Sequence, residues 1–186
     1  MICGMNIDEY INKIKEFHGF VAPGLLIGGY MVDLAKELID EVEFDAIVET
    51  SHCLPDAIQI LTPCTIGNGW LKIVEWDKFA LTLYNRFSYD GYRVWIDLAK
   101  TKFHPHIYNW YMRLVSKKDL PKEILVDAII NAEKSILSSM PVKVSNLNKR
   151  NKKGDINICL QCGEAYSLNQ GEKCLFCQGS AYYKIV

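Results

Sequence analysis

The chain has 186 residues, of which 23% are charged and 49% hydrophobic, and a formal net charge of -1. This length predicts one main domain with a substantial core plus a minor appendage, and only residues 142–157 are basic, with five Lys or Arg against one Asp. The sequence opens without a secretory pattern, and its uncharged, largely apolar stretch from Phe20 to Val32 has thirteen residues. A membrane-spanning helix needs about 20, so we expect a cytoplasmic protein without a membrane segment.

Two helices are predicted in the first forty residues. Asn6 followed by Glu9 is typical of a helix-opening capping box and predicts a helix over 7–17. Pro23 favours the start of a second helix that continues to residue 39. This second helix contains Gly24, Gly28 and Gly29. Each glycine costs about 1 kcal/mol of helix propensity relative to alanine, so we expect these glycines to permit close packing.

The middle and later parts of the core predict strands followed by helices. Runs of β-branched and aromatic residues predict strands over 44–50, 70–76, 79–87 and 92–98. We interpret the last three as an antiparallel meander. Apolar spacing then predicts helices over 106–116 and 122–138, and Pro141 is expected to end the domain. Residues 1–141 are therefore predicted to form an α+β domain whose antiparallel sheet packs against helices.

The stretch from residue 51 to 70 is predicted to hold one short buried helix. Pro55 suits its first turn, and Cys53 and Cys64 flank it. The hypothesis is that both cysteines face a common site. The alternative is that they are small buried hydrophobic residues.

The C-terminal segment predicts a metal site. Two Cys-x-x-Cys pairs, separated by eleven residues, supply Cys159, Cys162, Cys174 and Cys177. Gly163 and Gly179 are expected to take the backbone turns beside them. Four thiolates satisfy a tetrahedral Zn²⁺ and leave no open position, so the predicted ion is structural. Iron in a rubredoxin-like arrangement is the competing interpretation.

Between core and metal site the apolar pattern is lost. Residues 142–157 are predicted to form a basic linker, and residues 158–186 a zinc module. A basic run of this kind either contacts RNA or DNA or is simply solvated.

Three segments together resemble the FmdE family, whose name comes from formylmethanofuran dehydrogenase. They are His18-Gly19 before Pro23-Gly24-Leu25, the run from Cys53 to Gln59, and the run from Thr62 to Gly69. The resemblance implies an α+β core, a treble-clef zinc finger and an intertwined homodimer. It implies no secure biochemical activity, because roles in regulation, metal sensing and protein or RNA contact have all been suggested for the family.

The first motif departs from the family pattern His-Gly-His-x-Cys-Pro-Gly. Phe20 replaces the second His, and Ala22 replaces the Cys. His18, Cys53 and Cys64 remain as candidates for a catalytic or second metal site in the core, with two potential ligands lost. The alternative for His18 is a hydrogen-bonded histidine beside the second helix.

Two further histidine groups are candidates for a site. His52 adjoins Cys53, but neighbouring strand residues point to opposite faces, so both would reach one ion only through a turn. His104 and His106 flank a proline beside several aromatic residues, and packing is the favoured interpretation for that group.

These observations favour a zinc-containing accessory protein without enzymatic activity. It is expected to be a homodimer that uses the finger and linker for dimer assembly or for contact with a protein or RNA. The alternative is a metal- or thiol-dependent enzyme, or a small-molecule binder, acting in one-carbon chemistry through the core groove. Metal delivery or sensing ranks third, because a satisfied four-thiolate site exchanges zinc slowly.

Overall fold

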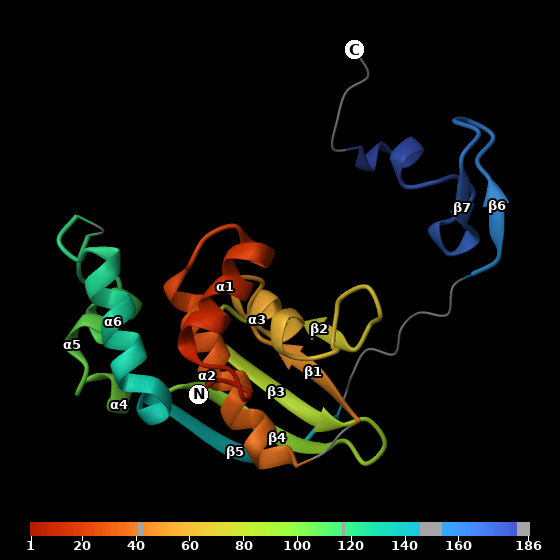
Figure 1. The fold of residues 1–186 in the computed structure, drawn as a ribbon. Helices are drawn as coiled ribbons and strands as arrows, with labels where there is room; N and C mark the ends of the chain where they lie inside the picture. The colour runs from red at the N-terminus through yellow and green to blue at the C-terminus, as the bar shows by residue number, and fades with distance from the viewer. Residues whose placement is uncertain (41–42, 117, 146–153, 182–186) are drawn as a thin grey trace. The chain divides into compact units, whose positions relative to one another are not determined.

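The computed structural model describes residues 1–40, 43–116, 118–145 and 154–181 (Figure 1). The chain divides into two compact units, Met1–Ser145 and Asn146–Val186. Each unit is described by itself.

Helices make up one layer of the first unit. They are α1 (Ile7–His18), α2 (Pro23–Ile39), α3 (Leu54–Leu61), α4 (Leu98–Thr101), α5 (Pro105–Tyr111) and α6 (Lys122–Ala132), followed by the 3₁₀ helix η1 (Glu133–Ile136). The predicted capping box is present, because the Asn6 and Glu9 side chains each accept a hydrogen bond from the other's backbone N–H. The first two predicted helices are confirmed within one residue.

A five-stranded sheet forms the second layer. Its strands are β1 (Phe44–Val48), β2 (Leu71–Ile73), β3 (Ala80–Asn85), β4 (Asp90–Ile96) and β5 (Leu137–Lys143), in the spatial order β2-β1-β3-β4-β5. The predicted meander is wrong for its first strand. β2 pairs parallel to β1, and β1 separates β2 from β3. The reason is that α3 carries the chain across, and such a crossover returns the next strand parallel.

The last predicted helix is too long, and Pro141 does not end the domain. The helix stops at Ala132, because Glu133 has a left-handed φ of 48°. Residues 137–143 then form β5, antiparallel to β4 at one edge of the sheet. Proline is tolerated in an edge strand, where the missing N–H breaks no internal ladder. The predicted helix was too long because residues with helical apolar spacing continue to Ile136. The α+β class is confirmed.

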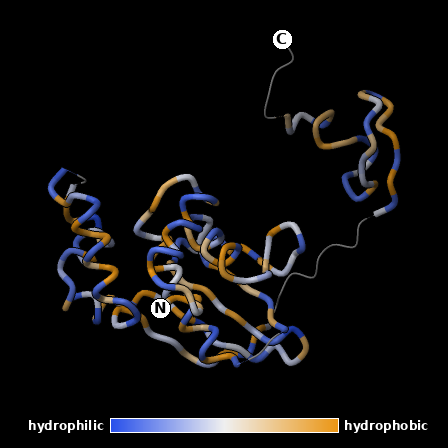
Figure 2. The backbone as a smooth tube through the Cα atoms, in the orientation of Figure 1, coloured by the Kyte–Doolittle hydropathy of each residue, from blue (hydrophilic) through white to orange (hydrophobic). Residues whose placement is uncertain are grey.

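The core includes buried residues of helix α2 and of the sheet, among them Leu25, Met31 and Leu83. Figure 2 colours the backbone by hydropathy. Gly24 and Gly28 allow this helix to approach α3 closely. A Cβ at Gly28 would lie 2.8 Å from the Ala57 Cβ, and one at Gly24 would lie 2.9 Å from the Cys53 Sγ. The expected packing role of these glycines is confirmed.

Helix length and hydropathy give no membrane-spanning segment in the described part of the chain. Among those residues, no single helix is long and apolar enough to cross a membrane. Helices α1 and α2 meet the criterion only as a pair bent by 120°.

The second unit contains a two-stranded antiparallel sheet and short turns. Its elements are β6 (Ile156–Ile158), β7 (Ala165–Ser167), the 3₁₀ turn Leu168–Gln170 and a final turn, Phe176–Ser180. Of the predicted linker 142–157, residues 142–143 belong to β5, residues 156–157 belong to β6, and 146–153 lie outside the described residues.

Candidate functional site

The four C-terminal thiols meet at one point of the second unit. Their sulfur atoms all lie within 4.8 Å of one another. Cys159 directly follows β6, and its carbonyl accepts a hydrogen bond from the Gly163 N–H at 2.8 Å. Gly163 and Gly179 have φ values of 79° and 98°, so both glycines take the left-handed turns expected of them.

The sulfur arrangement fits a tetrahedral zinc ion. Zn–S bonds of about 2.3 Å place two sulfurs about 3.8 Å apart in a tetrahedron. The Sγ atoms of Cys162 and Cys174 are 3.7 Å apart. Backbone N–H groups, chiefly that of Cys174, lower the pKa of Cys159 to about 6, which favours the thiolate that binds metal. Four protein ligands leave no position for a substrate, so this is a structural site.

His18 ends α1 and pairs with a carboxylate. Its Nδ1 lies 2.6 Å from the Asp56 Oδ2 in the first turn of α3. Phe20, which replaces the second histidine of the family motif, lies with its ring centre 4.8 Å from that of His18. Lys122 lies 5.6 Å from the centre of the Phe20 ring. An aromatic ring therefore adjoins the one histidine of the motif that remains, and a lysine lies over that ring.

Cys53 caps the N-terminus of α3 in an unusual backbone conformation. Its φ is 57°, and its side chain lies against Gly24. Burial, together with the negative charge of Asp56, raises the pKa of the Cys53 thiol. The thiol is therefore largely protonated at neutral pH.

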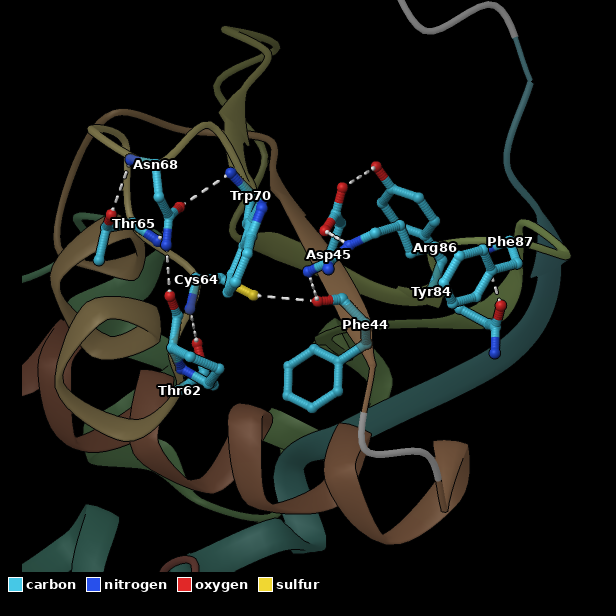
Figure 3. Close-up of polar contacts among 12 residues, drawn as sticks. Phe44, Asp45, Thr62, Cys64, Thr65, Asn68, Trp70, Tyr84, Arg86 and Phe87 are labelled. Carbon is cyan, nitrogen blue, oxygen red and sulfur yellow. Dashed lines mark hydrogen bonds and ion pairs between the residues drawn. The ribbon is translucent and has the colours of Figure 1, made fainter.

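Cys64 lies beyond the other end of α3 and is fully buried. Its Sγ donates to the carbonyl of Phe44 at 3.4 Å (Figure 3), and burial raises its pKa. The loop after it is ordered by Asn68, whose Oδ1 accepts from the backbone N–H groups of Thr65 and Trp70. Cys64 is thus a packed residue that contacts Phe44, the first residue of β1.

The structure does not gather the core candidates into a cluster. Within the described part of the chain, the C-terminal quartet is the one group of three or more His, Cys, Asp or Glu side chains with ligand atoms close enough to share an ion. His18, Cys53 and Cys64 form no such group.

The remaining histidines are also dispersed. His52 is exposed, and its backbone N–H donates to the Thr50 Oγ1. His104 Nε2 lies 3.1 Å from the Ser135 Oγ, whereas His106 is exposed. The neighbouring Trp110 and Tyr111 pack against the core.

Two ion pairs on the sheet were not predicted from the sequence. Arg93 binds Glu49 through two hydrogen bonds of 2.7 Å, and Arg86 donates to Asp45 at 2.9 Å. The Arg86 guanidinium also lies 4.1 Å from the centre of the Trp70 ring (Figure 3). No local signal links these residues, because the two members of each pair lie more than 40 positions apart in the sequence.

Comparison with known proteins identifies the family. Residues 17–146 match the family described as "FmdE, Molybdenum formylmethanofuran dehydrogenase operon". The chain belongs to the FmdE family. Residues 150–184 match the FmdE treble clef zinc finger, which agrees with the thiol geometry. This FmdE protein therefore holds one structural zinc ion through Cys159, Cys162, Cys174 and Cys177.

Two relatives of this FmdE protein differ in coverage. The crystal structure of a tungsten formylmethanofuran dehydrogenase FmdE-like protein from Syntrophus aciditrophicus is 44% identical, with a TM-score of 0.91 over 99% of this chain and 98% of that chain. A protein of Archaeoglobus fulgidus named "Probable S-adenosyl-L-methionine-binding protein" is 37% identical over 100 residues. That match covers 48% of this chain and only 27% of the relative's length.

Proposed function

We propose that this FmdE protein is a cytoplasmic, zinc-containing accessory protein that forms a homodimer and has no catalytic activity of its own. The zinc finger serves to complete the dimer or to contact another macromolecule. The observation that carries this proposal is the closed quartet of thiols within 4.8 Å, which offers zinc a full coordination shell.

The size of the finger supports a role in assembly. Its buried cluster consists of Cys159, Tyr166 and Cys174. A unit with so small a core folds chiefly through its metal, and its surface remains available for contacts.

The core site supports the accessory role because its groups are poorly suited to thiol chemistry. The raised pKa values of Cys53 and Cys64 keep both thiols protonated. Phe20 and Ala22 add apolar groups where the family motif has potential ligands.

The experiment compares zinc content and molar mass before and after zinc removal by a strong chelator. Size-exclusion chromatography with light scattering should give a dimer holding one zinc per chain, and a lower molar mass once zinc is removed. A monomer in both conditions would contradict the assembly role. Titration of the same samples with a fluorescent single-stranded RNA tests the contact role.

A second candidate is a small-molecule binder or metal- or thiol-dependent enzyme in one-carbon metabolism. The close His18–Asp56 pair next to Cys53 favours it, since a carboxylate orients the imidazole for proton transfer or metal binding. Metal analysis separates the candidates. A second metal equivalent that is lost on replacing Cys53 and Cys64 would support this candidate over the accessory role.

A further inference from the structure

The outer strand of the finger carries exposed hydrophobic side chains. Ile156 and Ile158 are 65% and 61% exposed, and Leu160 just beyond them is fully exposed. Alternate residues of a strand share one face, so the two isoleucines lie side by side. An apolar row of this kind on a small domain marks an interaction surface.

Among the residues that the structure describes, only β7 pairs with this strand, so its other hydrogen-bonding edge has no strand partner there. Cys159 N–H donates to the Glu164 carbonyl, and the Asp155 carbonyl accepts from the Leu168 N–H, so the odd-numbered positions of β6 face β7. In an antiparallel ladder the intervening residues direct their N–H and C=O groups away from that partner. Ile156 and Ile158 therefore present the outer edge, and the Asn157 Oδ1 accepts from the Ile158 N–H at 2.8 Å.

The chemistry of this surface favours a protein partner. Residues 154–181 contain three acidic residues and one lysine, whereas nucleic-acid surfaces depend on clustered cations. An open strand edge accepts another strand, and a strand that pairs antiparallel with its own copy is related to it by a two-fold axis. With Asn157 at the axis, Ile156 of one copy pairs with Ile158 of the other.

We propose that β6 pairs with β6 of a second copy of this chain and that the apolar row is buried in that contact. The pairing forms hydrogen bonds between the outward N–H and C=O groups of Ile156 and Ile158 of the two copies. The Ile158 N–H exchanges its bond with the Asn157 side chain for one with the second copy. This inference rests on the homodimer of the proposed function and names one surface within it.

The test measures the dimer dissociation constant by sedimentation at a series of protein concentrations. The double variant Ile156→Lys and Ile158→Lys should weaken the dimer at least about tenfold and keep one zinc per chain, because like charges would face each other across the axis. Leu175→Lys is the matched control, since Leu175 is 49% exposed but lies outside β6. It should leave the dissociation constant unchanged.

A second measurement applies to the unmodified protein and to Asn157→Ala. Amide hydrogen exchange at Ile156 and Ile158 should slow as protein concentration rises, and Asn157→Ala should tighten the dimer because it removes the competing acceptor. A native dimer that the double lysine variant leaves intact overturns this inference, whereas dimer loss on zinc removal would still support the proposed function. A native monomer at every concentration overturns both. Loss of RNA binding without loss of the dimer would assign the strand to nucleic acid and overturn the inference.

Discussion

The imidazole of His18 donates from Nδ1 to the Oδ2 of Asp56, and the two atoms are 2.6 Å apart although the residues are 38 positions apart in sequence. The contact joins the last residue of α1 to the first turn of α3. The Asp56 carboxylate also contributes its negative charge to the surroundings of Cys53, and this charge raises the pKa of the Cys53 thiol. The Asp56 side chain therefore influences both His18 and Cys53.

The first prediction concerns the reactivity of Cys53. Burial is the larger cause of its raised pKa, and the charge of Asp56 adds to it. Asp56→Asn removes that charge and should lower the thiol pKa, so the thiolate fraction below the pKa rises. We expect alkylation by iodoacetamide between pH 7 and 9 to accelerate at least about twofold. Peptide mass spectrometry of the zinc-loaded protein measures the rate at this cysteine.

Asp8→Asn is the control, because Asp8 lies in the first turn of α1 and does not act on this thiol. An unchanged or slower alkylation rate in Asp56→Asn would show that the carboxylate does not govern Cys53.

The second prediction concerns the contact between Gly24 and Cys53. Gly24→Ala places a methyl group 2.9 Å from the Cys53 Sγ and should cost about 1–3 kcal/mol of unfolding free energy by overpacking. Cys53→Gly removes the obstructing atoms and suits the φ of 57°. In that background the cost of Gly24→Ala should fall, as urea denaturation of the four proteins would measure. If the changes in unfolding free energy of the two single variants simply add in the double variant, the contact between residues 24 and 53 does not cause the cost.

The third prediction concerns the buried ion pair on the sheet. The Glu49 side chain is only 6% exposed and that of Arg93 is 23% exposed. Arg93→Met leaves the Glu49 carboxylate buried without its partner and should cost about 3 kcal/mol. Adding Glu49→Gln should recover part of this loss. Lys143→Met, which breaks the exposed pair with Asp90, is the control and should have a much smaller effect on urea denaturation.

The fourth prediction concerns metal removal. Cys162→Ser leaves three thiolates, so zinc content should fall from one ion per chain to nearly none. The finger should become protease-sensitive, because its stability comes from the metal. The first unit should keep its resistance and its melting temperature, since it has its own core. Limited proteolysis with mass spectrometry separates the two effects, and a variant that retains zinc and resistance would contradict the four-thiolate site.

The features that sequence predicted correctly have local signals. The capping box around Asn6 and Glu9 fixed the start of α1, and Pro23 fixed the start of α2. The zinc site was predictable because Cys-x-x-Cys spacing brings two thiolates to one ion regardless of the rest of the fold. In each case the residues that determine the structure lie within a few positions of one another.

The features that sequence missed depend on distant partners. Insertion of β1 between β2 and β3 and the Arg93–Glu49 pair both join segments far apart in the chain. The pairing of His18 with Asp56 is of the same kind. Cys53 and Cys64 looked like one site because α3 is short, but its two ends contact different parts of the core.

The two sheets treat their outer strands differently. β5 carries Pro141, which cannot donate a hydrogen bond and so discourages lateral growth of the larger sheet. β6 has no proline and exposes isoleucine. Concentrated preparations should therefore self-associate first through β6 of the second unit. Solubility during purification should depend on this strand more than on the first unit.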